Sequence, residues 1–401
     1  MIRSAESHDV PAIPLPRLTV GLGTNQLLSW GTTFYLPAVI AGTVARELGT
    51  TQAAVLGAFS WSLLVTGTCA PRVGEWIGGR GALAASTLVL ATGLVALAAA
   101  PDLAGWYIGW TILGAGMALG LYDAAFATAG TLLGPAVGPV ITGVTLIAGF
   151  ASTVGWPAGA ELLHVLGWRG MLLAYAGAQL AVNLPLVLAI VPRGPVLQSD
   201  TGVSADGSRT GRERRAAIAC LAGFFAIRWF LTSAIATHVL LLMAGLGLSA
   251  GEGLAAAMLI GPGQVAGRLL EWVLAGRMGV LTRARCGALL FPAGALALGL
   301  GGPVAAAVFA VLYGMSNGIL TVNRGTLPML VLGPQGYAAL LGWLALPVLL
   351  AQAAAPPVSA PLVGALPAQM VLLLAGGVAF GAALLLLPLR PWQPAGRGGV
   401  T

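Results

Sequence analysis

Charged side chains lie within or at the ends of long apolar stretches of this sequence, among them Arg228, Arg268, Arg324 and Asp123. A charge at the centre of a bilayer costs roughly 3 kcal/mol or more, so such residues usually face a partner or a water-filled cavity. A guanidinium in that setting holds an anionic group through paired, charge-assisted hydrogen bonds. These residue types therefore predict the binding of an anion, and they make the single carboxylate a candidate for carrying a proton.

Arg228 lies about twelve residues into the apolar stretch 216–246. At roughly 1.5 Å per residue this is about 18 Å along a helix, near the midplane of a hydrocarbon core about 30 Å thick. We expect Arg228 to face a central cavity and bind an anionic substrate. The alternative is a structural ion pair with an acid on a neighbouring helix.

Arg268 and Glu271 are three residues apart, a spacing that puts both on one face of a helix. Arg72 and Glu75 repeat this spacing 196 residues earlier, which suggests a duplicated chain. For Arg268 two interpretations stay open: contact with the substrate, or a local pair with Glu271 that closes an inner gate. For Arg72 and Glu75 the sequence favours the gate.

Asp123 follows Tyr122 in the inner half of an apolar stretch. A buried carboxyl beside an arginine is a candidate proton carrier, because binding of an anion to that arginine would change its protonation. The alternative is a permanent ion pair with Arg324 or Arg72. Both interpretations stay open from sequence.

Aromatic and polar side chains recur in two further apolar stretches. Trp30 and Tyr35 accompany a polar helical face in the stretch 18–44, and Tyr313 and Asn317 do the same in 303–323. We expect these four to contact the substrate. Polar residues also join membrane helices to one another, so some of each face has that role instead.

The composition of the chain predicts that membrane-spanning helices position these residues. Of 401 residues, 58% are hydrophobic and only 8% are charged, with a mean hydropathy of +0.92. A soluble domain carries roughly 25% charged residues, so the composition predicts an all-α, multi-pass membrane protein. The net charge of +7 does not indicate nucleic-acid binding, because the arginines lie between apolar stretches and not on one basic face.

The usual marks of an enzyme are missing. Lysine does not occur, so the chain has no Walker lysine for a nucleotide, and we find neither a hydrolase elbow nor histidines at metal-ligand spacing. We therefore expect a protein that is not an enzyme and that uses no cofactor and no metal.

Twelve apolar runs are long enough, at about 20 residues, to span a bilayer. They divide the chain into a tail (1–17), a first six-helix bundle (18–191), a linker (192–215), a second six-helix bundle (216–389) and a final tail (390–401). The runs are 18–44, 53–71, 82–100, 103–133, 137–163, 170–191, 216–246, 250–275, 284–301, 303–323, 337–363 and 368–389.

The arginines predict the orientation. If the N-terminus is cytoplasmic, fourteen arginines lie on the cytoplasmic side and only Arg46 and Arg169 lie outside. This is the bias expected from the positive-inside rule. We expect a multi-pass protein of a bacterial cytoplasmic (inner) membrane with both termini in the cytoplasm.

The two halves share matched residues. Gly116 and Gly120 match Gly314 and Gly318 at an offset of 198, and Leu133-Gly134-Pro135 matches Leu332-Gly333-Pro334 at 199, as Trp30 matches Trp229. A near-constant offset indicates two parallel repeats.

Six plus six spans, a polar linker and the loop from Gly74 to Gly81 resemble the major facilitator superfamily. Gly78 stands where that family's loop has an aspartate. The resemblance implies two bundles that work by alternating access, and a monomer embedded in the lipid bilayer.

Gly267-Arg268, Trp272 and Gly276-Arg277 resemble the monocarboxylate and oxalate/formate branch of that family. The resemblance implies that Arg268 binds a substrate carboxylate. We therefore expect a secondary transporter of a small organic anion, coupled to protons or working by exchange. One alternative is an efflux protein for a drug-like or metalloid compound, suggested by Gly155-Trp156-Pro157; another is a membrane receptor or assembly protein that transports nothing.

Overall fold

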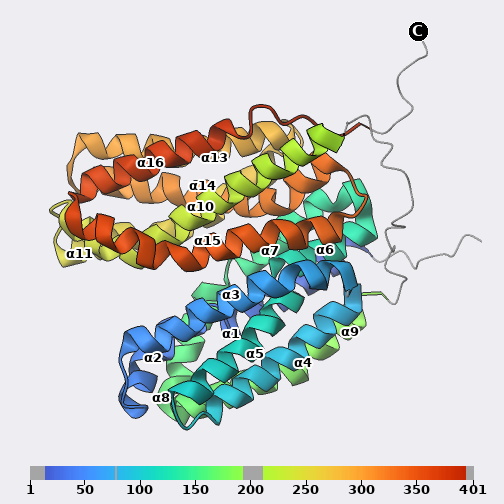
Figure 1. The fold of residues 1–401 in the computed structure, drawn as a ribbon, viewed down its shortest axis with the longest axis vertical. Helices are drawn as coiled ribbons and strands as arrows, with labels where there is room; N and C mark the ends of the chain where they lie inside the picture. The colour runs from blue at the N-terminus through green and yellow to red at the C-terminus, as the bar shows by residue number, and fades with distance from the viewer. Residues whose placement is uncertain (1–13, 77–78, 193–210, 394–401) are drawn as a thin grey trace, which may run out of the picture.

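The computed structural model describes residues 14–76, 79–192 and 211–393, apart from the side chains of 74–76, 152–153 and 156. Every regular element in these ranges is a helix, and the helices form two elongated bodies (Figure 1). The first body contains α1 (Leu15–Thr32), α2 (Leu36–Glu47), α3 (Gln52–Trp76), α4 (Gly79–Ala98), α5 (Leu103–Gly120), α6 (Tyr122–Leu133), η1 (Gly134–Val137), α7 (Gly138–Ala148), α8 (Ala151–Ala178), η2 (Gln179–Asn183) and α9 (Leu184–Ile190).

The second body follows the linker. It contains α10 (Gly211–Gly245), α11 (Ala250–Met258), α12 (Ile260–Leu274), α13 (Val280–Ala297), η3 (Leu298–Leu300), α14 (Gly302–Leu332), α15 (Tyr337–Ala365) and α16 (Ala368–Leu384).

Ten helical stretches in the described ranges are long and apolar enough to cross a membrane, and α16 is a shorter apolar helix. The count is lower than twelve partly because the stretch Leu103–Ala148 joins two of the expected runs. Inside it the chain turns at Gly134, whose φ of 53° is a conformation that glycine adopts at little cost. A second such turn, at Gly167 with φ 68°, lies inside α8. The division into twelve spans stays a prediction.

The expected continuous helix over 18–44 is broken between α1 and α2 at Thr33, Phe34 and Tyr35. Pro37 in the first turn of α2 explains the break, because proline has no N–H to donate and its ring clashes with the carbonyl four residues earlier, here that of Thr33. A second break, at Leu121, separates α5 from α6.

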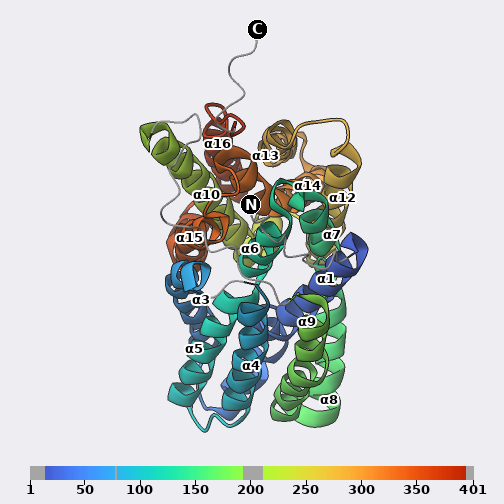
Figure 2. The ribbon, with the colours of Figure 1, turned by 90° about the vertical axis from the view of Figure 1, so that its right-hand side faces the viewer.

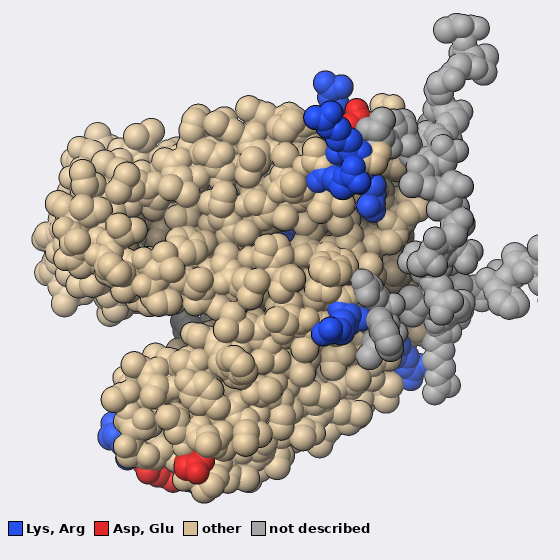
Figure 3. Space-filling view, in the orientation of Figure 1, with Lys and Arg blue, Asp and Glu red and all other residues tan. Residues whose placement is uncertain are grey.

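Most of the arginines outside the helix interiors lie at one end of both bodies, which we call the arginine-rich end. In Figure 3 basic side chains gather toward this end, and a notch separates the two bodies at the opposite end. The described arginines at or near the helix ends that lie there, the starts of α1, α4, α10 and α13 and the ends of α3, α12 and α16, are Arg17, Arg72, Arg80, Arg212, Arg214, Arg215, Arg277, Arg283, Arg285 and Arg390.

Among the described residues, the hydrophobic clusters that contain side chains of both bodies lie toward the arginine-rich end. One shared cluster joins Phe126 and Ile141 of the first body to Met329 and Tyr337 of the second, and another packs α3 against α15. Figure 2, seen from this end, places α15 beside α3 and α7 beside α12.

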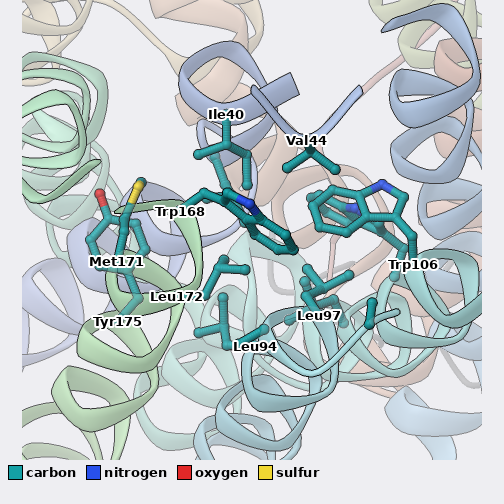
Figure 4. Packing of buried hydrophobic residues seen from close by; sticks show 14 of the residues in the cluster. Ile40, Val44, Leu94, Leu97, Trp106, Trp168, Met171, Leu172 and Tyr175 are labelled. Carbon is teal, nitrogen blue, oxygen red and sulfur yellow. The ribbon is translucent and has the colours of Figure 1, made fainter. Parts of the chain in front are cut away.

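Two other clusters stay within a single body at the opposite end. One contains Trp106, Trp168 and Leu94 of the first body (Figure 4), and its counterpart contains Phe291 and Phe309 of the second. The bodies are therefore closed against each other at the arginine-rich end and separated at the other end.

Candidate functional site

An ion pair bridges the two bodies. Arg324, in the C-terminal half of α14, donates from Nη2 to Asp123 Oδ2 at 2.6 Å, and Asp123 lies in the first turn of α6, after the break at Leu121. The guanidinium carbon of Arg324 also lies 5.2 Å from the ring centroid of Trp229, from α10. Of the two interpretations of Asp123, the structure contains the pair with Arg324.

Aromatic side chains surround the first-body half of this pair. The Trp30 ring lies 4.8 Å from that of Tyr122 and 6.4 Å from that of Tyr35, between centroids. Trp30 Nε1 donates to Gln26 Oε1 at 3.2 Å, and Gln26 Nε2 donates to the Gly120 carbonyl at 2.7 Å, at the break before α6. Gln26 thus satisfies a backbone group beside the helix break and connects α1 to the end of α5.

Arg268 extends from α12 of the second body toward the first body. Its side chain is buried, Nε has no hydrogen-bond partner, and Nη1 occupies the space beside Gly149, at the end of α7. The guanidinium is also within electrostatic range of Tyr122. Arg268 therefore adds a second cation to the interface where Arg324 meets Asp123.

The local pair of Arg268 and Glu271, one of the two interpretations left open from sequence, is wrong. Glu271 Oε1 instead accepts from Arg283 Nε at 2.9 Å, and both residues are buried. The physical reason is the next helix: the first turn of α13 places Arg283 against Glu271, where it also donates to the backbone carbonyls of Ala275 and Met278 beyond α12. An arginine that binds the carboxylate and these carbonyls together displaces the neighbour on the same helix.

Arg228 lies inside the second body and is 1% exposed. Its Nη2 donates to Ser316 Oγ at 3.0 Å and to Asn317 Oδ1 at 3.2 Å, and its guanidinium carbon is 4.8 Å from the centroid of the Phe291 ring. Tyr313 belongs to the same cluster and donates to the Thr232 carbonyl at 3.2 Å. Among the described side chains Arg228 forms no ion pair, so the expected alternative of a structural pair with an acid is not found there.

The polar face of α1 is buried against the helix that follows α8. Asn25 donates to Asn183 Oδ1 at 3.0 Å, and Gln179 donates to Thr32 Oγ1 at 2.7 Å. These contacts fit the role of joining helices. Sequence reasoning missed the partners, Gln179 and Asn183, which lie on a π-helical turn of a kind often found at functional sites. Two amides four residues apart in an apolar run were the available signal.

The predicted gate at Arg72 and Glu75 is only partly visible. Arg72 is exposed near the end of α3, while the side chain of Glu75 lies outside the described residues. In the part of the chain that is described, no three His, Cys, Asp or Glu side chains gather as metal ligands.

Comparison with known proteins identifies the architecture. No protein-family profile and no curated protein matches the sequence. Solved structures do match: the human organic anion transporter MFSD10 at 18% identity and a TM-score of 0.73, over 93% of this chain and 99% of that one. The chain has the major facilitator fold.

Two further solved structures have this fold. The proton:xylose symporter XylE matches at 14% identity with a TM-score of 0.72, over 95% of this chain and 97% of that one. FucP in the outward conformation matches at 16% identity with a TM-score of 0.68, over 94% and 99%. The family resemblance predicted from sequence is thus confirmed at the level of the fold. Within this fold, the pair of Asp123 and Arg324 bridges the two bodies, Trp30 packs on Tyr122 next to Asp123, and Arg268 reaches the first body at Gly149.

Proposed function

We propose that the protein is a secondary active transporter of a small organic anion, a monocarboxylate or a close relative. The observation that supports this most is the excess of cation at the interface of the bodies. Arg324 forms an ion pair with Asp123, and Glu271 forms one with Arg283. Arg268 is left buried with an unpartnered Nε, and a buried cation of this kind is stabilised by an anion.

The proposed framework is twelve spans in two six-helix units, 18–191 and 216–389, joined by the linker 192–215 and working as a monomer. The protein would lie in a bacterial inner membrane with the arginine-rich end, both tails and the linker in the cytoplasm. In this orientation the structure is closed toward the cytoplasm and open to the outside. The human organic anion transporter among its structural neighbours is in keeping with the proposed substrate class.

The proposed coupling uses the pair between the bodies. An incoming carboxylate competes with Asp123 for Arg324, and protonation of Asp123 releases that arginine to the substrate. Arg268 supplies the second positive charge, while Trp30 and Tyr35 contact the apolar part of the substrate. Arg228, Asn317 and Tyr313 provide a further, deeper anion contact. Uptake with a proton and exchange of anions both follow from this arrangement.

Uptake of a labelled monocarboxylate into proteoliposomes tests the proposal, with and without an inward proton gradient. Arg268→Gln should lower uptake at least tenfold, because one bidentate contact with a carboxylate is lost. Arg212→Gln is the matched control, since Arg212 is exposed in the first turn of α10. Full carboxylate uptake by both Arg268→Gln and Arg228→Gln would refute the anion site.

The aromatic cluster supports efflux of a drug-like or metalloid compound as a second candidate. The Trp30 ring contacts Phe34, at 4.7 Å between centroids, as well as Tyr122, and such a surface suits an apolar substrate. Resistance of overexpressing cells to a toxic panel, unchanged in Arg268→Gln, would favour efflux over anion transport.

A further inference from the structure

A cavity of about 630 Å³ lies between the two bodies at the arginine-rich end. Val137 and Pro139, where α7 begins, line it from the first body. Trp272, Met278 and Met329 line it from the second, and Trp392 lines it from the segment after α16. Apolar side chains, among them tryptophan, methionine and proline, make up most of these walls, so the cavity suits an apolar occupant.

One wall of the cavity continues onto the outer surface of α12. Trp272 lines the cavity and is also 59% exposed. Its neighbours Leu269, Leu270 and Val273 are exposed as well, which gives α12 an apolar outer face. In a bilayer such a face contacts acyl chains, and tryptophan is enriched at the level of the headgroups. The cavity is therefore accessible from the membrane.

Two arginines and the backbone of Trp392 define the remaining surroundings of the cavity. Arg277 is exposed and lies in the chain between Ala275 and Met278, which both line the cavity, so it is an exposed cation next to the lining in sequence. Arg283, deeper in the wall, is already paired with Glu271. Trp392 is held in place by a hydrogen bond from its backbone N–H to the Leu330 carbonyl at 2.8 Å. An occupant thus meets apolar walls inside, and Arg277 is an exposed cation beside the lining within the described part of the chain.

We propose that this cavity holds an acyl chain of an anionic phospholipid from the leaflet at the arginine-rich end, with the headgroup at Arg277. Basic pockets between membrane helices on the cytoplasmic side are suited to anionic headgroups. The inference rests on the proposed membrane placement, but it requires no particular transport substrate.

Binding in this cavity depends on the conformation of the protein. Its walls come from both bodies, so the cavity has this shape only while the bodies are closed at the arginine-rich end. A ligand that binds one of two states shifts the population toward that state. The lipid therefore stabilises the closed arrangement seen here.

Native mass spectrometry of the full chain from mixed phosphatidylglycerol and phosphatidylcholine nanodiscs tests the site. Gly279→Phe and Gly138→Phe fill the cavity from the second and first body respectively, because both glycines line it and a Cβ at either position meets no atom within 4 Å. Each should reduce retained phosphatidylglycerol at least fivefold. Gly276→Phe, equally free of neighbours but outside the lining, should retain it.

Arg277→Gln separates the headgroup from the chain: it should remove the preference for phosphatidylglycerol over phosphatidylcholine and leave a bound lipid. Equal retention by the filled variants and the unsubstituted protein would overturn the proposal. So would a retained lipid without any headgroup preference, or a bound amphiphile that is not a phospholipid.

A second measurement does not depend on folding of the filled variants. Phosphatidylglycerol with brominated acyl chains should quench Trp392, measured as the difference between the unsubstituted protein and Trp392→Phe. Quenching should saturate at a low mole fraction of this lipid. Quenching that only rises in proportion to its mole fraction would mean that no site exists. Failure of carboxylate uptake would leave both lipid measurements unaffected.

Discussion

At the scale of single residues, the pair of Asp123 and Arg324 joins the two bodies, which also share two apolar clusters. The Asp123 side chain is 22% exposed and that of Arg324 is 11% exposed. Removing one partner of a fully buried pair costs about 3–5 kcal/mol, since the other charge is left unpaired. The cost here should be lower, because solvent reaches the carboxylate.

Asp123→Asn should therefore lower the melting temperature in detergent, while the double variant Asp123→Asn, Arg324→Gln should recover part of the loss. A double-mutant cycle measures this recovery as a coupling of about 0.5–3 kcal/mol, the range for residues in contact. Strictly additive effects of the two substitutions would show that the two charges do not interact in solution.

A second cycle identifies the partner of Glu271. Glu271 is 1% exposed and bonded to Arg283, and Arg268 on the same helix is not its partner in the structure. Glu271→Gln should be coupled to Arg283→Gln by at least about 1 kcal/mol and nearly additive with Arg268→Gln. Thermal unfolding of the three single and two double variants measures both terms. Stronger coupling to Arg268 would restore the interpretation suggested by the three-residue spacing.

At the scale of elements, α12 and α14 approach each other through two pairs of glycines. Gly263 and Gly267 on α12 face Gly314 and Gly318 on α14, each pair spaced four residues apart. A Cβ on Gly263 would lie 2.8 Å from the Val311 carbonyl oxygen and 3.3 Å from the Gly314 Cα. Small residues at this spacing let the backbones of membrane helices pack closely, which also keeps Arg268, next to Gly267, in a fixed position.

Gly318→Ala should destabilise the protein, since the added methyl falls against the backbone of Gln264, which cannot turn aside as a side chain would. Overpacking of this kind costs about 1–3 kcal/mol. Gly276→Ala is the matched control, because a Cβ there meets nothing within 4 Å. Thermal unfolding measures the melting temperature of both variants. An unchanged melting temperature for Gly318→Ala would mean that α12 and α14 move apart at little cost.

At the scale of the whole molecule, the sequence predicted the helical class and the fold, because a low content of charge and long apolar runs leave few alternatives. The sequence was less informative about features that depend on contacts between distant segments. The break after Thr33 is local and follows from Pro37. The partner of Glu271 depends on where α13 begins.

The glycine matches that predicted the repeat show the same limit. Gly116 and Gly120 pack against α4, whereas Gly314 and Gly318 pack against α12, so residues at matching positions face different neighbours. The offset between the halves was informative about the repeat, and the contacts had to come from the structure.

Movement of the two bodies against each other, which alternating access requires, is open to a direct test. A Cβ on Gly67 would lie 3.1 Å from the Cβ of Leu349, on the opposite body. Disulfides need a Cβ separation of about 3.5–4.5 Å, so a shift of a few tenths of an ångström suffices. In a chain whose Cys69, Cys220 and Cys286 are first replaced by serine, Gly67→Cys and Leu349→Cys should cross-link and reduce uptake at least tenfold, and a reductant should restore it.

The matched control is Gly253→Cys with Met243→Cys, where the Cβ separation is also 3.1 Å but both residues belong to the second body. That cross-link constrains α11 against α10 and leaves the two bodies free, so it should leave uptake unchanged. If the chain cross-linked between Gly67 and Leu349 transports at the full rate, α3 and α15 do not separate during transport. If both cross-links stop transport equally, the loss reflects rigidity within a body, and movement between the bodies would no longer be its explanation.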